Sequence, residues 1–155
     1  MCYIVMDKEL SRQAKKYFAQ IRKVERLIKR LNGITETLRA SLFSTGAQLK
    51  QDKVQTSGRK NAFAETEDKI IDFERDINAR KAELVSMKHE AFTMINRIPN
   101  LSQRDILLAR YIQSQEWEDI AADSHYSMKW VFDQHQKGLI AFSKANSDFL
   151  SNRVK

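Results

Sequence analysis

The chain has 155 residues, of which 42% are apolar and 30% are charged, so it can bury a core and does not have the composition of a disordered segment. It contains four glycines and one proline, too few turn residues for a strand-rich fold. Cys2 is the single cysteine, and no apolar run approaches the roughly 20 residues of a membrane span. We therefore expect a soluble, cytoplasmic, all-α protein that is not associated with a membrane.

The formal net charge of +7 is concentrated near the N-terminus. Residues 1–60 carry 14 basic and 5 acidic side chains, whereas residues 99–155 carry seven of each. A basic excess favours association with nucleic acid or another acidic partner and says little about the fold.

The first predicted element is a long helix. Over residues 7–32, apolar residues recur at alternating steps of four and three, which is the pattern of a helix that packs along another helix. These residues are Leu10, Ala14, Tyr17, Ile21, Val24, Ile28 and Leu31. Gly33 weakens a helix, so the continuation at Ile34, Leu38 and Leu42 could form a separate short helix.

A second helix follows a polar segment. Residues 44–60 contain two glycines and no sustained period, which predicts a mobile, basic connection. This range is long for a connection between helices, so part of it could be locally helical. The pattern then resumes over 63–98 at Phe63, Thr66, Ile70, Phe73, Ile77, Arg80, Leu84, Met87, Ala91, Met94 and Ile98. A stripe this narrow cannot bury itself. We therefore predict that residues 7–98 form a long, antiparallel, coiled-coil-like helical hairpin, through which the chain also forms a homodimer.

Shorter helices are predicted after Pro99, which ends the second helix because proline lacks a backbone N–H. Ser102 begins a sequence like a capping box, and Ser127 has the residue type and position of an N-cap. The predicted helices cover 102–113, 116–123 and 127 to the mid-140s. They form a small domain over 101–146, with a tail at 147–155.

Residues Trp117–Gln136 fit the template of a helix-turn-helix. An apolar and a small residue in the first helix, an apolar turn residue and an apolar anchor in the second helix would pack the unit. These packing residues are Trp117, Ile120, Ala121, Tyr126 and Val131. Two positions depart from the template. Ser124 stands where an apolar residue is usual, and His125 stands where glycine is usual because the turn needs a positive φ.

The last helix of this unit would enter a DNA major groove. Its outward-facing candidates are Ser127, Met128, Lys129, Phe132, Asp133, Gln136 and Lys137. Lys129 and Lys137 would contact phosphates. Further phosphate or partner contacts are expected from the N-terminal basic excess, at Lys15, Lys16, Arg22, Lys23, Lys50, Lys53, Arg59 and Lys60.

No catalytic constellation stands out in the sequence. The three histidines have no cysteine or paired carboxylate at zinc spacing, and no phosphate loop or dinucleotide motif occurs. We expect no metal, no cofactor and no enzymatic activity.

Several segments resemble those of the RinA/ArpU-like late transcriptional regulators, a family of phage and prophage proteins from Gram-positive bacteria. They are Asp7-Lys-Glu9, Lys69-Ile-Ile-Asp-Phe-Glu74, Leu107-Leu-Ala-Arg-Tyr-Ile112, Trp117-Glu-Asp-Ile-Ala121 and Tyr126-Ser-Met-Lys-Trp-Val-Phe-Asp-Gln-His135. The resemblance covers most of residues 7–145. It implies a C-terminal part similar to region 4 of sigma factors, binding to double-stranded DNA at phage promoters, and contact with host RNA polymerase.

The chain departs from this family at Met128 and Asp133, where basic residues are usual. Three hypotheses about function therefore remain open. The first is a DNA-binding phage transcriptional regulator. The second is a non-enzymatic interaction protein, such as an inhibitor or anti-repressor, that binds a protein partner through the hairpin and a degenerate helix-turn-helix. The third is a DNA-packaging protein like a small terminase subunit.

Overall fold

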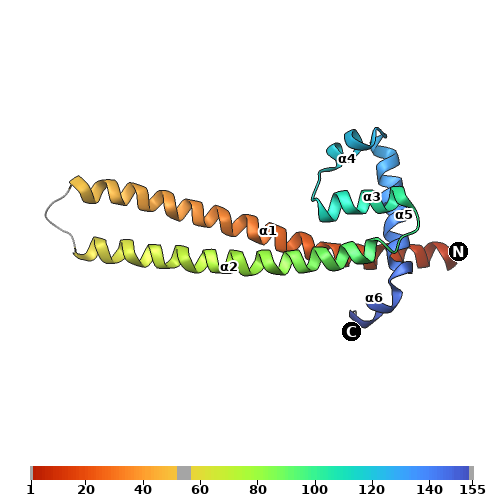
Figure 1. Ribbon diagram of the computed structural model, residues 1–155, viewed down its shortest axis with the longest axis horizontal. Coiled ribbons are helices and arrows are strands. Elements are labelled where there is room, and N and C mark those ends of the chain that lie inside the picture. Colours follow the sequence, from red (N-terminus) through yellow and green to blue (C-terminus); the bar gives the residue numbers. More distant parts are fainter. Residues whose placement is uncertain (1, 52–56, 154–155) are drawn as a thin grey trace. The chain divides into compact units, whose positions relative to one another are not determined.

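The computed structural model describes residues 2–51 and 57–153, with side chains described for 3–46 and 58–152. Every regular element in these ranges is a helix, which confirms the predicted all-α class. The elements are α1 (Cys2–Gln51), α2 (Ser57–Ile95), α3 (Leu101–Leu107), the π-helix η1 (Leu108–Ile112), α4 (Trp117–Ser124), α5 (Met128–Ala145) and α6 (Ser147–Arg153) (Figure 1). Within the described ranges, no helix is both long enough and apolar enough to span a membrane.

The two long helices α1 and α2 pack against each other as the predicted hairpin (Figure 1). Helix α1 continues through Gly33 without a break, so no separate short helix follows it. The buried position after Leu31 is Thr35 and not Ile34, which is 39% exposed. The Thr35 hydroxyl donates to the Leu31 carbonyl oxygen at 2.9 Å, which lets a polar residue occupy the seam.

The segment over 44–60, predicted as a polar connection that could be helical in part, is helical over much of its length. Helix α1 runs to Gln51 and α2 begins at Ser57, so most of that range is helical. The predicted contact residue Lys53 and the side chain of Lys50 lie outside the described residues.

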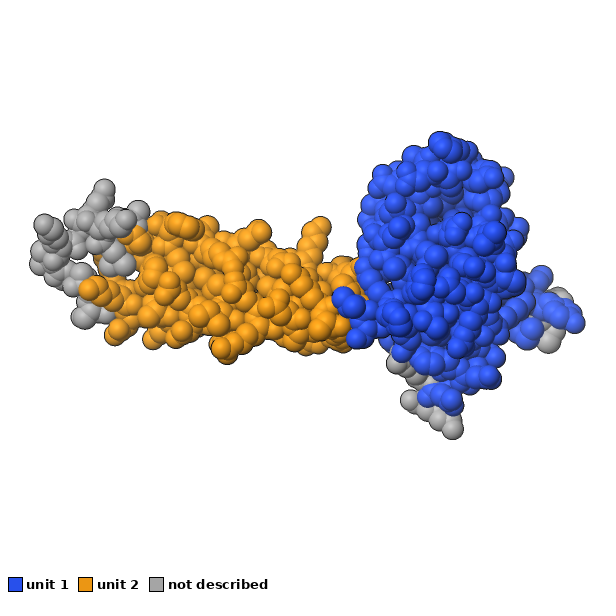
Figure 2. Space-filling view, in the orientation of Figure 1, with its two compact units in different colours: residues 1–23, 85–155 blue, residues 24–84 orange. Residues whose placement is uncertain are grey.

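The chain divides into two compact units (Figure 2). Unit 1 comprises Met1–Lys23 and Val85–Lys155, and unit 2 comprises Val24–Leu84. This division differs from the predicted ranges 7–98 and 101–146, because the start of α1 and the end of α2 share a core with the C-terminal helices.

Unit 2 is held together by the heptad seam of α1 and α2. Ile28, Leu31 and Ile77 form its buried cluster, and Val24, Phe73 and Leu84 pack against that cluster. Burial of each such side chain contributes about 1.5–3 kcal/mol to stability. An ion pair between Arg39 and Glu74 joins the two helices at the surface.

Unit 1 has an aromatic core that the heptad seam did not predict. Phe18 is fully buried, although it lies outside the seam. Its ring stacks on Tyr111 of η1 at a centroid distance of 4.0 Å and lies 4.6 Å from Phe142 of α5. Helix α1 therefore presents two apolar faces in this unit, one toward α2 and one toward the C-terminal helices.

Helix α3 begins earlier than the capping-box pattern predicted. Its N-cap is Asn100, whose side chain accepts a hydrogen bond from the Gln103 backbone N–H at 3.1 Å, and not Ser102. After about two turns the α-helix gives way to η1, which ends before Ser114, a residue with a φ of 58°. The predicted helix over 102–113 is thus two elements of different pitch.

The segment predicted as a tail is largely helical. Helix α6 covers Ser147–Arg153, and its Leu150 is only 4% exposed. The buried Asn146 precedes it and donates to the carbonyl oxygens of Met94 and Phe142 at 3.1 and 2.9 Å. This amide fixes the end of α5 against the end of α2.

Candidate nucleic-acid interface

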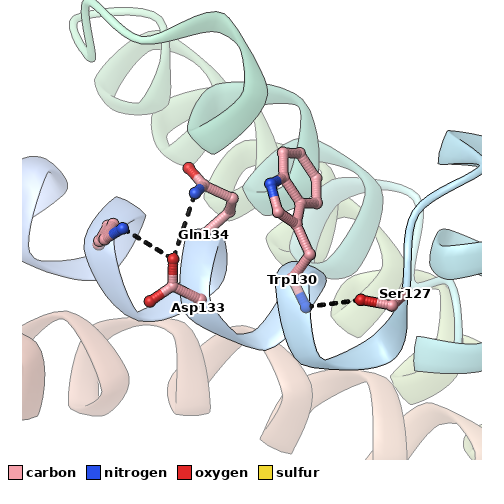
Figure 3. A network of polar contacts seen from close by, with 5 residues as sticks. Ser127, Trp130, Asp133 and Gln134 are labelled. Atoms are coloured by element: carbon pink, nitrogen blue, oxygen red, sulfur yellow. Dashed lines mark hydrogen bonds and ion pairs between the residues drawn. The ribbon is translucent and has the colours of Figure 1, made fainter.

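Helices α4 and α5 are joined by a tight turn at the place where the sequence predicts a helix-turn-helix. His125 lies in the left-handed region at φ 58° and ψ 25°, as its position in the template predicted. Ser127 is the N-cap of α5, and its hydroxyl accepts from the Trp130 backbone N–H at 3.2 Å (Figure 3). A serine N-cap satisfies one of the otherwise unpaired N–H groups of the first helical turn.

The predicted packing residues of this unit form one cluster, with one exception. Ile120 of α4 and Val131 of α5 are buried together with Ile106 of α3. Trp117 and Ala121 pack against that cluster, together with Ala109 and Trp130. Tyr126 lies outside it: the side chain is 55% exposed, and the ring stacks on Trp130 at 3.9 Å.

A buried arginine that no sequence pattern predicted contacts the start of α4. Arg110 is 8% exposed, and its guanidinium lies 4.4 Å from the ring centroid of Trp117. Its Nη1 donates to the Gln115 carbonyl oxygen at 2.7 Å and to the Glu116 carboxylate at 3.2 Å. The wider π-helical turn at η1 places Arg110 and Tyr111 together in the core.

The outer face of α5 carries the predicted groove-facing residues. Ser127, Lys129, Phe132, Asp133, Gln136 and Lys137 are exposed, and Met128 is half-buried. The Phe132 ring leans on Trp117 at a centroid distance of 5.0 Å. The face is therefore accessible along the first three turns of the helix.

Most polar groups on that face already have partners within the protein. The Asp133 carboxylate accepts from Lys137 at 2.7 Å and from Gln134 at 3.3 Å (Figure 3). The Gln136 amide donates to the hydroxyl of Ser11 on α1 at 2.7 Å. Lys129 has no ion-pair partner among the described residues, and it is the unneutralised cation of this face.

Behind the exposed face, α5 contributes a buried histidine to the core. His135 Nε2 lies 2.9 Å from the Tyr111 hydroxyl, and its ring meets Trp117 edge-on at 4.7 Å. Burial, and then the positive charges of Lys15 and Arg110, lower the pKa of His135 to about 4. Burial raises the pKa of Tyr111, although Arg110 and Arg22 act in the opposite direction. Both rings are therefore neutral at physiological pH.

The remaining predicted contact residues fall in different units. Lys15, Lys16 and Lys23 are exposed on α1 in unit 1, and Arg22 beside them is half-buried. Arg59 and Lys60 are exposed on α2 in unit 2. The structure thus brings the first group, and not the second, into the compact unit that contains the helix-turn-helix.

Helix α4 is acidic. Glu118 and Asp119 lie in its first turn, where the helix dipole stabilises negative charge, and Asp123 lies near its end. These exposed carboxylates oppose the approach of phosphate on this side of the unit.

An open cleft of about 570 Å³ lies beside the helix-turn-helix in unit 1. Its walls are mainly apolar and come from the end of α2, α3, η1 and α4, with Asp105 and Asp123 among the lining residues. Nowhere in the described part of the chain do three potential metal ligands among His, Cys, Asp and Glu come together.

Comparisons of the chain with protein-family models, with curated proteins and with solved structures find no match.

Proposed function

We propose that unit 1 is a DNA-binding module whose helix α5 enters the major groove of double-stranded DNA. One observation carries this proposal: α4 and α5 meet at a capped turn with a positive φ, and the first three turns of α5 remain exposed beyond it. In proteins with this geometry, the residues near the start of the second helix contact base edges.

The residues at the start of α5 suit this role in different ways. Lys129 has no ion-pair partner in the described part of the chain and can contact a phosphate or the acceptor groups of guanine. The aromatic edge of exposed Phe132 can pack against a thymine methyl group. Ser127 is already engaged as an N-cap, so its hydroxyl contributes mainly to the position of the helix.

The resemblance to RinA/ArpU-like regulators extends the proposal to a biological role. We propose regulation of transcription at phage or prophage promoters in the bacterial cytoplasm, with RNA polymerase as a further partner. Homodimerisation through the hairpin would place two such modules on one promoter. The role is one of binding and not of catalysis.

A fluorescence-anisotropy titration with duplexes from upstream of phage late genes tests the proposal. The wild-type chain is expected to bind at low salt, and Lys129→Ala combined with Lys137→Ala is expected to weaken binding at least tenfold. Lys69→Ala combined with Lys81→Ala, two exposed lysines of unit 2, removes the same charge and serves as the control. An absence of binding at low salt, or equal losses in both variants, would contradict the proposal.

A second candidate function, the binding of a protein partner, is favoured by the cleft beside α3 and α4. Its apolar walls and its two aspartates suit an apolar segment with a basic residue. Phe92, which is 45% exposed, lines this cleft. A partner captured from nuclease-treated host lysate by the wild-type chain, and lost with Phe92→Asp while DNA binding is unchanged, would favour this function.

A further inference from the structure

The charge of unit 1 is concentrated at the start of α1 and not on the helix-turn-helix. Residues 1–23 contain six basic and two acidic side chains, whereas residues 85–152 contain seven basic and eight acidic ones. The two acidic groups of the first segment are both paired: Asp7 with Lys144 at 3.5 Å, and Glu9 with Arg12 at 3.3 Å. The attraction of unit 1 for a polyanion therefore originates mainly in α1.

The basic side chains of this segment share one side of the helix. At 3.6 residues per turn they fall within an arc of about 120°. Five of them are exposed and one, Arg22, is half-buried. We call this set the α1 basic face; it consists of Lys8, Arg12, Lys15, Lys16, Arg22 and Lys23. Lys8, Lys15, Lys16 and Lys23 make no ion pair among the described residues.

The α1 basic face lies next to α5. Ser11, which accepts the hydrogen bond from Gln136 at 2.7 Å, has Lys8 three residues before it and Lys15 four residues after it on the same side of α1. Two turns after Gln136 on α5, the Ser143 hydroxyl donates to the carbonyl oxygen of Leu10, the residue before Ser11, at 2.6 Å. In Figure 3 the faint red ribbon of α1 runs directly beneath α5.

Gln136 joins the exposed side of α5 to the helix that carries the α1 basic face. It lies on the same side of α5 as Lys129 and Phe132, two turns after Lys129 and one turn after Phe132. Because Gln136 donates to Ser11, the exposed side of α5 that carries Lys129 and Phe132 adjoins the α1 basic face at this point. A duplex that contacts the start of α5 would therefore meet lysines of α1 along its adjoining backbone.

We infer that the α1 basic face is a phosphate-binding track that grips the backbone of the duplex whose groove α5 enters, and that it supplies most of the binding affinity. This inference rests on the proposed DNA binding by unit 1. Neutralising a phosphate with lysine releases condensed counterions, and each contact changes log K by about 0.9 per tenfold change in salt. The track acts on any sequence, while α5 provides the discrimination between sequences.

An anionic membrane is the less fitting partner for this face. A helix that lies on a lipid surface must insert its apolar side. Along the basic face, the apolar side of α1 is buried in unit 1, since Ala14, Tyr17, Phe18 and Ile21 have exposed fractions of 0, 6, 0 and 1%. The exposed apolar residues Tyr3, Ile4, Val5 and Met6 lie at the start of α1, before Lys8. A nucleic-acid backbone requires the charged side alone.

The test compares the salt dependence of three full-length chains on a random-sequence duplex by fluorescence anisotropy. The track variant is Lys8→Gln with Lys15→Gln, and the matched control is Lys69→Gln with Lys81→Gln, which removes the same charge from unit 2. All four lysines are exposed, so the three chains should have the same melting temperature by circular dichroism. For the track variant, the slope of log K against log salt is expected to become shallower by about two, and its affinity at 0.1 M salt is expected to fall roughly 60-fold. The affinity of the control variant is expected to change less than threefold.

The outcomes separate this inference from the proposed function. If the wild type binds DNA and Lys129→Ala weakens it, but the track and control variants behave alike, the track is wrong and the DNA-binding function stands. If the wild type binds no duplex, both are wrong. If it binds vesicles of anionic phospholipid through Lys8 and Lys15 more tightly than DNA, the phosphate track on DNA is likewise overturned.

Discussion

His135 and Tyr111 form the polar centre of the unit 1 core. Their hydrogen bond, 2.9 Å long, joins α5 to η1, and Phe18 covers Tyr111 from the side of α1. A protonated imidazole at this place would be a buried cation next to Arg110 and near Lys15, so the fold requires the neutral form.

This requirement makes the stability of unit 1 sensitive to acid. The pKa of His135 is about 4 in the folded chain and about 6.5 in the unfolded chain, so between these values the unfolded chain binds one proton more. Stability is therefore full above pH 6.5 and falls as the pH drops toward 4, by roughly 3 kcal/mol from this group. Urea unfolding at pH 7 and pH 4.5 should show that the free energy of unfolding falls less in His135→Gln than in the wild type. The glutamine keeps a hydrogen-bond acceptor for Tyr111. Equal losses in both chains would contradict the prediction.

Asp133 limits the electrostatic attraction of α5 for DNA. Its carboxylate both adds a negative charge and holds Lys137 at 2.7 Å. Asp133→Asn is expected to raise DNA affinity about eightfold at 0.1 M salt and to steepen the salt slope by about one, because Lys137 becomes available to a phosphate. Anisotropy titrations measure both. Asp72→Asn, which frees Arg75 in unit 2 in the same way, is the control and should change affinity little.

At the scale of elements, two helical glycines differ in the space around them. A Cβ at Gly33 would meet nothing within 4 Å, whereas a Cβ at Gly138 would lie 3.3 Å from the Gln103 carbonyl oxygen and 3.4 Å from Leu107 Cγ. Gly138 therefore allows α5 to approach α3 closely, while Gly33 has no packing role.

The glycine pair gives a prediction for stability. Gly33→Ala is expected to stabilise the chain by about 1 kcal/mol, because alanine favours the helix and meets no obstacle. Gly138→Ala should stabilise it clearly less, or destabilise it, since α3 must shift. Urea unfolding of the two variants decides this, and an equal gain in both would show that α3 and α5 do not pack as closely as described.

The local features were predictable because each depends on neighbouring residues. The heptad steps predicted the seam between the long helices, and the residue type of Ser127 predicted the N-cap of α5. The helix-turn-helix template predicted the positive φ of His125. The pairing of Asp133 with Lys137 also has a sequence signal, a spacing of four residues on a helix.

Other features depend on contacts that no local pattern contains. Nothing in the spacing around Ser11 indicates Gln136, which is 125 positions away. The change of pitch at η1 follows from the packing of Arg110 and Tyr111, and the apolar pattern of 102–113 gave no sign of it.

For the whole molecule, the two tryptophans provide a selective probe. Trp117 and Trp130 both belong to unit 1, while circular dichroism reports the helices of both units. Unit 1 has its own core, and the 2.9 Å contact between Tyr17 and Glu90 holds the start of α1 beside the end of α2. It should therefore fold without the hairpin's distal part.

We predict that a chain in which residues 24–84 are replaced by a short Gly-Ser linker folds cooperatively. Its tryptophan fluorescence should match that of the full chain, and its fluorescence and dichroism transitions in urea should coincide. A chain that lacks a cooperative fluorescence transition would mean that unit 1 depends on unit 2 for its stability.

The contact between α1 and α5 can form only late in the synthesis of the protein. Tyr17, Phe18 and Ile21 leave the ribosome early, yet Phe142, which covers Phe18, is made more than 100 residues later. At bacterial elongation rates of about 5–20 residues per second, this interval is on the order of ten seconds. Throughout that time the nascent chain must therefore leave the Phe18 side of α1 uncovered, and this makes α1 the segment at which a chaperone would act or aggregation would begin.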